Sequence, residues 1–505
     1  MSSRRRQVHF NPSAASWITT SAPSAHIFQF HRRLPRYEPT PLISLPDAAR
    51  EIGVGQIHVK SEADRLGLPS FKILGASWAT FRSLAEKLSL PLDSRIETVR
   101  DAAAAAAASS SSGSEFRVYC ATEGNHGRAV ARMASILGVA AEVHVPGHAH
   151  PVTVELIRSE GATVVVSRGN YDDAVLEATE ASAKNESGIL VQDYAYGDYL
   201  QIPQWIVDGY LTMMWETDEQ LGGMRADLVV APVGVGSFAQ AVVSYFKQQA
   251  KASSVLAVEP DTAACLWKSL EKGKLTSVPT TSTIMAGLNC GAPSVIAWDV
   301  LKSGVDASLT VSDYEAHQAA LYLQAQGVAA GPCGSSTLAA LRRLTAADKS
   351  ALGLGEESTV VIFCTEGARQ YDAPHDVSSD DPAILTRTLV QIDSTSPSLG
   401  SVPGSGETRM AEYVSAWLEH RHLETHWVEP TEGQPSVVKV ARGTGEGKSH
   451  MFDGFIDTVT LQGYDGDPLD GKVVHGRHHS RGAADVKAGL AAMMGALSSA
   501  ETLNL

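Results

Sequence analysis

Between about residues 51 and 364, short apolar runs alternate with longer amphipathic runs. The runs 118–120 and 143–145, for example, each precede an amphipathic stretch, at 127–137 and 152–159. A short apolar run has the length of a buried strand, and an amphipathic run suits a helix that packs on a sheet. The alternation therefore predicts an α/β fold built around a mostly parallel sheet. The other strand candidates are 57–59, 163–166, 228–231, 255–258 and 360–363.

The composition changes near residue 382. A chain of 505 residues exceeds what one hydrophobic core usually organises. After Asp380-Asp381-Pro382 the strand and helix pattern restarts at 384–392, and a Ser/Pro/Gly-rich segment follows. We therefore expect an N-terminal extension (1–34), a main domain (35–380) and a C-terminal segment (383–505). Within the main domain, seven consecutive alanines before a serine-rich run are typical of a surface insertion.

Charge and cysteine usage exclude several classes of protein. The chain has 41 basic and 56 acidic residues, so its formal charge of −15 repels polyanions and predicts no nucleic-acid partner. No apolar run approaches the ~20 residues needed to span a bilayer, which predicts no membrane association. The five cysteines are scattered and never in a C-x-x-C pair. They therefore indicate a cytoplasmic protein, although the arginine- and serine-rich start leaves a mitochondrial address open.

Lys72 is the first candidate for chemistry. It follows a glycine- and proline-containing turn and lies between Phe71 and Ile73. Apolar neighbours would depress the pKa of the amine and make its neutral form available to react with an aldehyde. A lone lysine is usually only a solvated charge. Lys72 therefore depends on other motifs for a functional interpretation.

Two glycine-containing motifs give Lys72 that context. Gly234-Val235-Gly236-Ser237 follows the apolar run 228–231 and precedes an amphipathic run, an order that aims backbone N–H groups and a helix N-terminus at a phosphate. Asn125 lies in a glycine-flanked turn and suits a hydrogen bond to the phenolic oxygen of pyridoxal. Together with Lys72 they predict pyridoxal 5′-phosphate, held as a Schiff base. A dinucleotide is the poorer alternative, because the loop lacks the third glycine of that fingerprint.

Two carboxylates and two neutral side chains complete the candidate site. Glu123 and Asp193 follow predicted strands and could move protons at the substrate, although capping or surface pairing is an equal alternative for each. Cys364 and Thr365 end another predicted strand and could place a thiol or hydroxyl near the pyridine nitrogen. A neutral partner there would favour elimination over reactions that need a full electron sink.

These motifs resemble those of the fold type II pyridoxal phosphate enzymes, and within them the diaminopropionate ammonia-lyase family. The resemblance implies a two-lobed, tryptophan synthase β-like fold and a homodimer. It also implies that Lys72 carries the cofactor, that Asn125 contacts its ring, that Gly234 to Ser237 hold its phosphate, and that Glu123 and Asp193 are acid/base groups. The family usually has aspartate where Glu123 stands. The matching runs are 65–76, 121–128, 191–193, 234–237, 283–291 and 365–367.

The last third of the chain is similar to the beginning of the M20 metallopeptidase and deacylase family. The similarity lies in the runs 389–394, 406–407, 454–459 and 482–487. Phe455 stands where that family has a histidine ligand, and a phenyl ring cannot bind zinc. Adjacent histidines, His478 and His479, lie in a polar loop and are more often solvated than metal-bound. We expect a truncated, metal-free remnant and predict no metal.

The resemblance implies β-elimination on 2,3-diaminopropionate or a similar β-substituted amino acid, with pyruvate and ammonia as products. A serine or threonine dehydratase is the alternative enzyme, because it shares every cofactor motif and differs in the leaving group. A non-catalytic pyridoxal-binding protein is the alternative from another class. An active metallohydrolase is disfavoured by Phe455.

Overall fold

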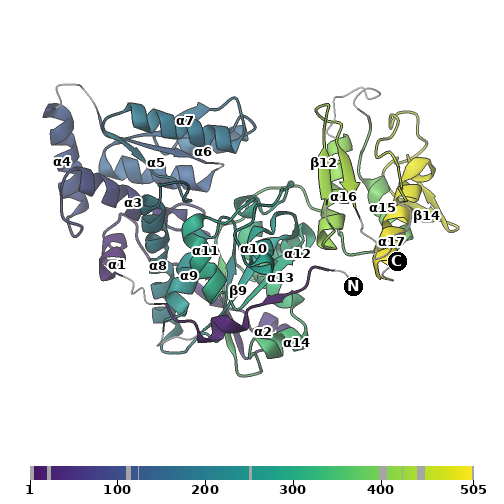
Figure 1. Cartoon of the computed structure of the whole chain (residues 1–505), viewed down its shortest axis with the longest axis horizontal. Coiled ribbons are helices and arrows are strands. Elements are labelled where there is room, and N and C mark those ends of the chain that lie inside the picture. Colours follow the sequence, from purple (N-terminus) through teal and green to yellow (C-terminus); the bar gives the residue numbers. More distant parts are fainter. Residues whose placement is uncertain are drawn as a thin grey trace.

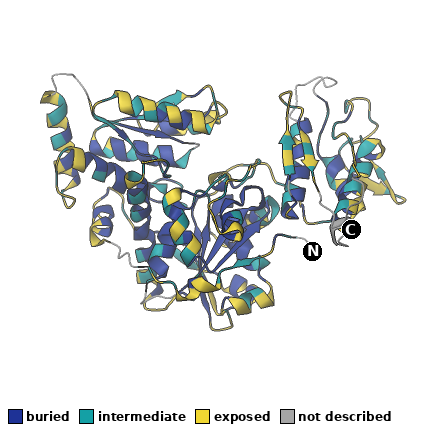
Figure 2. Cartoon of the chain, viewed as in Figure 1, coloured by how far each residue is buried: buried dark blue, intermediate teal, exposed yellow. Residues whose placement is uncertain are grey.

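Two parallel sheets organise the first three quarters of the chain (Figure 1). The structure is a computed structural model that describes residues 5–19, 24–109, 115–122, 124–248, 253–396, 406–423, 425–440 and 450–502. Figure 2 shows the buried residues concentrated along both sheets and on the helix faces turned towards them. Among the described helices, none combines the length and the apolar character that a bilayer crossing requires.

The larger sheet has seven strands in the order β1-β10-β9-β8-β11-β3-β2. Its five central strands run parallel, and the short edge strands β1 and β2 pair antiparallel. Every residue of β8, β10 and β11 is buried, and β8 and β11 accordingly consist of nearly continuous apolar runs. The bounds are β1 (His9–Phe10), β2 (Leu42–Ser44), β3 (Gln56–Ser61), β8 (Leu228–Pro232), β9 (Ser254–Pro260), β10 (Ala307–Val311) and β11 (Thr359–Cys364).

Helices on both sides of this sheet complete the larger lobe. They include α8, whose 21 residues run beside α3 at the junction of the lobes (Figure 1). The helices are α1 (Ala25–His31), α2 (Pro46–Ile52), α8 (Gln201–Leu221), α9 (Ser237–Phe246), α10 (Cys265–Lys272), α11 (Val295–Gly304), α12 (Asp313–Ala325), α13 (Pro332–Arg343) and α14 (Ala346–Ala351), with short 3₁₀ turns η1 (Pro12–Ser16), η2 (Asp261–Ala263) and η3 (Ala286–Leu288).

The smaller lobe is a four-stranded parallel sheet in the order β6-β5-β4-β7. The alanine-rich run belongs to α4, on which Val99 and Ala103 are buried, so the alanines continue a packed helix. The serines at 110–114 lie outside the described residues. The elements are α3 (Lys72–Lys87), α4 (Ile96–Ser109), β4 (Arg117–Ala121), α5 (Asn125–Leu137), β5 (Ala140–Val145), α6 (Pro151–Arg158), β6 (Thr163–Val166), α7 (Tyr171–Lys184) and β7 (Gly188–Leu190).

The strand candidates read from the sequence are confirmed, and with them the α/β class and the two-lobed form. Each of the seven predicted runs falls within a strand of one of the two sheets. Sequence reasoning gave no range for the short edge strands β1 and β2 or for β7 and β10. β7 is only three residues long. β10 alternates small and polar residues although it is fully buried.

Residues beyond about 377 pack around a separate hydrophobic cluster that includes Leu385, Met410, Trp417 and Met494. We call this part the C-terminal unit (right in Figure 1). Its start, where the strand and helix pattern restarts in the sequence, forms helix α15. The elements are α15 (Pro382–Gln391), α16 (Gly406–His420), α17 (Ala488–Thr502), the π-helical turn η4 (Ala483–Lys487) and the hairpins β12 (Thr425–Val428) with β13 (Ser436–Lys439) and β14 (Lys472–Val474) with β15 (Arg477–His479).

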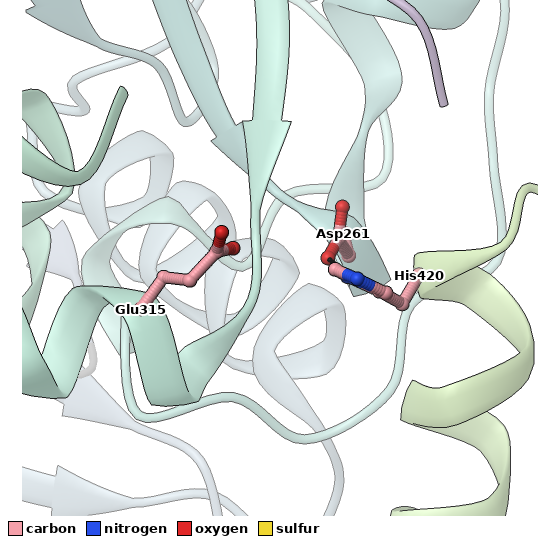
Figure 3. A group of neighbouring side chains, drawn as sticks. All are labelled: Asp261, Glu315 and His420. Atoms are coloured by element: carbon pink, nitrogen blue, oxygen red, sulfur yellow. Dashed lines mark hydrogen bonds and ion pairs between the residues drawn. The ribbon is translucent and has the colours of Figure 1, made fainter. Parts of the chain in front are cut away.

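A polar junction joins α16 to the larger lobe. The Asp261 carboxylate lies 2.7 Å from Nδ1 of His420, and Figure 3 shows these two side chains turned towards each other. Arg6 donates to the Asp261 carbonyl oxygen at 3.0 Å and reaches Glu419 at 3.3 Å. Together the nearby cations, first of all His420, outweigh burial and hold the pKa of Asp261 well below its ordinary value. Charged partners from the N-terminal segment therefore fasten the C-terminal unit to the larger lobe.

A buried ionic network supports the loop that leads to Lys72. Arg65 contacts Glu62 and Glu216 at 2.6 Å each, and Lys60 contacts Glu216 at 2.8 Å. All four side chains are fully buried. Because Arg65 precedes Lys72 by only seven residues, the network fixes the loop to α8.

Glu216→Ala should lower the free energy of unfolding by about 3–5 kcal/mol, because it leaves the buried charges of Lys60 and Arg65 underpaired. Burial alone would raise the pKa of Glu216, but Arg65 and Lys60 outweigh it and lower the pKa to about 2. A depressed pKa means that this contribution is present above the unfolded value of about 4.5 and is lost as the pH falls towards 2. Urea unfolding measures the change. Exposed Glu219, on the same helix, is the control: Glu219→Ala should change stability by less than about 0.5 kcal/mol, and an equal loss would refute the network's role.

Candidate active site

Lys72 and Asp193 meet between the lobes. Lys72 is the first residue of α3, and its Nζ lies 2.6 Å from Oδ2 of Asp193, which follows β7. Burial alone would lower the pKa of Lys72, but Asp193 outweighs it and the pKa is raised above its ordinary value. The expectation of a depressed pKa is therefore wrong for this arrangement. Apolar neighbours in sequence did not reveal a carboxylate that lies 121 positions away.

The Asp193 carboxylate is ionised. Burial would raise its pKa, but the Lys72 ammonium outweighs burial and lowers it to about 2. His126 is buried, and its Nε2 lies 2.8 Å from the carbonyl oxygen of Val191. A carbonyl oxygen only accepts, so Nε2 carries the proton. Burial lowers the pKa of His126, so the ring is neutral and presents unprotonated Nδ1 at 3.9 Å from Asp193 Oδ2.

The glycine loop lies beside this pair. The hydroxyl of Ser237, the first residue of α9, donates to the main-chain oxygen of Asp193 at 2.9 Å. Gly236 has φ +92°, a conformation that L side chains rarely adopt. A Cβ on Gly234 would lie 2.8 Å from the Gly287 carbonyl oxygen. The loop and the N-terminus of α9 therefore form a cradle that only glycine fits and that suits a phosphate.

The end of β11 borders the same place. The Thr365 carbonyl oxygen accepts a hydrogen bond of 3.3 Å from the main-chain N–H of Phe71, directly before Lys72. The Cys364 thiol is buried, and burial raises its pKa to about 12, so it is neutral. The start of α13 packs closely against this strand end, because a Cβ on Gly334 would lie 2.8 Å from Cys364 Sγ.

The two remaining sequence candidates lie at the start of α5. Asn125 is the first residue of that helix and is half-buried, after Gly124 in an extended conformation. The helix starts two residues before the buried Gly127, where a Cβ would clash with Thr122 at 2.4 Å. Glu123 lies outside the described residues, so its position stays a prediction.

Sequence reasoning missed the functional importance of two buried polar groups near Lys72. Neither Nδ1 of His126 nor the hydroxyl of Tyr210 has a hydrogen-bond partner among the described residues. The Tyr210 ring packs on Phe71 at 4.7 Å between centroids. His126 could have been found through its place beside Asn125, whereas Tyr210 lies in α8 without any sequence signal. Buried polar groups without partners are costly, and a polar ligand at Lys72 would satisfy them.

The residues at this site fit pyridoxal phosphate. They supply an amine, a glycine cradle at a helix N-terminus and polar atoms left for a ligand, and comparisons with known proteins agree. The chain is 35% identical over 316 residues to diaminopropionate ammonia-lyase of Salmonella typhimurium, which covers 61% of this chain and 77% of the relative. It is 33% identical over 360 residues to diaminopropionate ammonia-lyase of Escherichia coli, which covers 67% of this chain and 87% of the relative.

Solved structures show the same similarity. The Escherichia coli diaminopropionate ammonia-lyase in complex with an aminoacrylate-PLP azomethine reaction intermediate has a TM-score of 0.62 and 29% identity, covering 72% of this chain and 93% of that chain. The same enzyme in complex with D-serine has a TM-score of 0.64 and 28% identity, with the same coverage. Residues 34–366 match the family described as pyridoxal-phosphate dependent enzyme. With Lys72, the glycine loop and the fold in agreement, the chain belongs to the pyridoxal-phosphate dependent enzymes.

Proposed function

We propose that the protein is an ammonia-lyase that acts on 2,3-diaminopropionate or a similar β-substituted amino acid and releases pyruvate and ammonia. The observation that carries the proposal is the Lys72–Asp193 pair, 2.6 Å apart beside the Ser237 loop. The named relatives are diaminopropionate ammonia-lyases. The combination of an amine and an ionised carboxylate at one position suits the removal and delivery of protons.

When bound, pyridoxal phosphate supplies an electron sink for cleavage of bonds at the substrate Cα. In our proposal Lys72 holds the cofactor and moves the Cα proton through Nζ. Once the lysine amine is released and has taken up the Cα proton, Asp193 would hold the resulting ammonium and pass that proton through Oδ2 to the leaving β-amine. His126, whose Nε2–H is held by the Val191 carbonyl oxygen, presents an unprotonated Nδ1 beside this carboxylate and would accept a hydrogen bond from the ligand there. Glu123 is the second proposed acid/base group.

The cofactor contacts are assigned by position. We propose that Asn125 binds the ring, and that the 234–237 loop and the α9 N-terminus bind the phosphate. Cys364 and Thr365 face the pyridine nitrogen with neutral groups, and the raised pKa of the Cys364 thiol supports this assignment. A neutral partner favours elimination, since the ring then remains unprotonated.

Serine or threonine dehydration is the competing activity. L-threonine ammonia-lyases also match this chain, at 28% identity over 239 residues for that of Geobacter sulfurreducens. The holoenzyme should be incubated separately with diaminopropionate, serine and threonine while pyruvate or 2-oxobutyrate is measured. A higher kcat/KM for diaminopropionate supports our proposal. A higher value for serine or threonine replaces it with the dehydratase, and no product from any of them supports a non-catalytic binding protein.

The remaining proposals concern assembly and the C-terminal unit. We propose a cytoplasmic homodimer whose main domain spans residues 35–380, and a metal-free, M20-like C-terminal segment from 383 to 505. Phe455 supports the loss of metal binding, because it cannot act as a ligand and its side chain is half exposed. The separate cluster around Trp417 supports an independent folding unit.

A further inference from the structure

A pocket of about 520 Å³ lies between the larger lobe and the C-terminal unit, away from Lys72. One wall comes from the segment 282–284 and the start of α12, and the opposite wall comes from α16 and the end of α15. The volume is in the range of small-molecule sites. Sites of this kind occur preferentially where two folding units meet.

Two carboxyl groups, Asp313 from α12 and Glu412 from α16, line the pocket. Both form hydrogen bonds with the adjacent residues Ser282 and Thr283. Asp313, at the start of α12, accepts hydrogen bonds from the Thr283 hydroxyl and from the main-chain N–H of Ile284, the latter at 2.9 Å. Glu412, on α16, is hydrogen-bonded to Ser282. Neither carboxyl forms an ion pair within the described part of the chain. Their partners are neutral donors, so negative charge is left available to a ligand.

The two arginines of the pocket are already engaged. Arg409 forms an ion pair with Asp372. Arg369 donates to the Ile284 carbonyl oxygen and lies over the Tyr371 ring, 5.8 Å from its centroid. Of the other acidic lining residues, Asp261 and Asp372 are paired with His420 and Arg409, whereas Asp393, like Asp313 and Glu412, forms no ion pair within the described residues. The pocket is therefore suited to a cation.

Aromatic rings add to that preference. Tyr413 and His375 line the pocket and contact each other edge to face, with ring centroids 6.1 Å apart. Aromatic faces attract ammonium groups. Burial raises the pKa of Asp313 to about 6 and raises that of Glu412, and the nearby charges of Arg369 and Arg409 offset this effect only in part.

We propose that this pocket is a binding site for a small organic cation with an ammonium group, held between Asp313 and Glu412. Asp261, at the edge of the pocket, belongs to a neighbouring group with Glu315 and His420, whose ligating atoms lie within 4.8 Å of one another. In that group Arg5 pairs with Glu315 and His420 pairs with Asp261. Those atoms are thus already used by protein partners, and Figure 3 shows the Glu315 carboxylate directed from α12 towards the other two side chains.

The pocket is connected to the cofactor loop through a short segment. Residues 282–284 form its wall, and the chain continues directly into η3 (Ala286–Leu288). The Gly287 carbonyl oxygen lies where it would contact a Cβ on Gly234 at 2.8 Å. Only a few positions in the sequence therefore separate the pocket wall from a residue that borders the phosphate loop.

Choline tests the proposal, because its quaternary nitrogen is a permanent cation that cannot react with the cofactor aldehyde. Calorimetric titration of the full-length holoenzyme should show saturable binding of choline. Glu412→Gln and Asp313→Asn should each weaken it by about tenfold or more, since each removes one carboxylate from the site. Unchanged cofactor absorbance and thermal unfolding would show that the variants are folded.

Glu432→Gln is the matched control, because it removes the same charge from an exposed position of the C-terminal unit. It should leave choline affinity unchanged. Equal affinity in Glu412→Gln and Glu432→Gln would overturn the proposal. So would the absence of saturable choline binding, or binding of the dianion glutarate in its place.

Discussion

Lys72→Ala should reduce pyruvate formation from 2,3-diaminopropionate by about 10⁴-fold or more and abolish the visible absorbance of bound cofactor. In our proposal this amine holds the cofactor and moves the Cα proton. Removal of a covalent catalytic group has effects of this order. Steady-state assays and absorbance spectra of the purified variant measure both changes.

Lys87→Ala is the control for this prediction. Lys87 ends the same helix, is exposed, and its Nζ donates to the carbonyl oxygen of Glu186 at 3.4 Å. Its replacement should leave activity and absorbance within about twofold of the wild type. Circular dichroism should show that both variants keep their secondary structure. Turnover retained in Lys72→Ala would contradict the assignment of the catalytic amine.

Asp193→Asn should lower kcat by about 10²–10⁴-fold and leave the cofactor bound. The substitution keeps the shape of the side chain but removes the charge that holds the Lys72 ammonium and the capacity to carry a proton. Because the pKa of Asp193 is lowered to about 2, the wild-type carboxylate is ionised throughout the neutral range, so the loss should be nearly independent of pH there. Stopped-flow and steady-state kinetics across that range test both statements.

Asp198→Asn is the matched control, because Asp198 is exposed in the same loop five residues later. Its effect on kcat should stay within about twofold. If Asp193→Asn keeps wild-type kcat, Asp193 is not an acid/base group. If the Asp193→Asn variant loses the cofactor absorbance altogether, the role of Asp193 is to hold Lys72 and the site in place.

The strands and the cofactor motifs could be predicted because their signals are local. Each buried strand is an apolar run, and the glycines at 234 and 236 are required by close contact and by a positive φ within their own loop. The pKa of Lys72 could not be predicted in this way, because Asp193 reaches it from a position 121 residues away in the sequence. Tyr210 and the Glu216 network likewise depend on the packing of α8, which brings distant residues together.

The junction with the C-terminal unit also had no sequence signal. In the sequence, Arg5 and Arg6 are only part of an arginine- and serine-rich start. In the structure, Arg6 contacts both Asp261 and Glu419, which lie on opposite sides of the junction. The pocket proposed for a cation arises from the same packing, since Asp313 and Glu412 lie 99 positions apart and meet only at Ser282-Thr283. Side chains from two units form such sites, so a motif search within either unit does not detect them.

The proposed activity depends on the covalent attachment of the cofactor to Lys72. Reduction of the holoenzyme with borohydride, followed by proteolysis and mass spectrometry of the peptides, locates the attached pyridoxyl group. We expect the pyridoxyl group on Lys72, in the peptide that contains Phe71 and Ile73. A pyridoxyl group found on another lysine, with Lys72 unmodified, would contradict it.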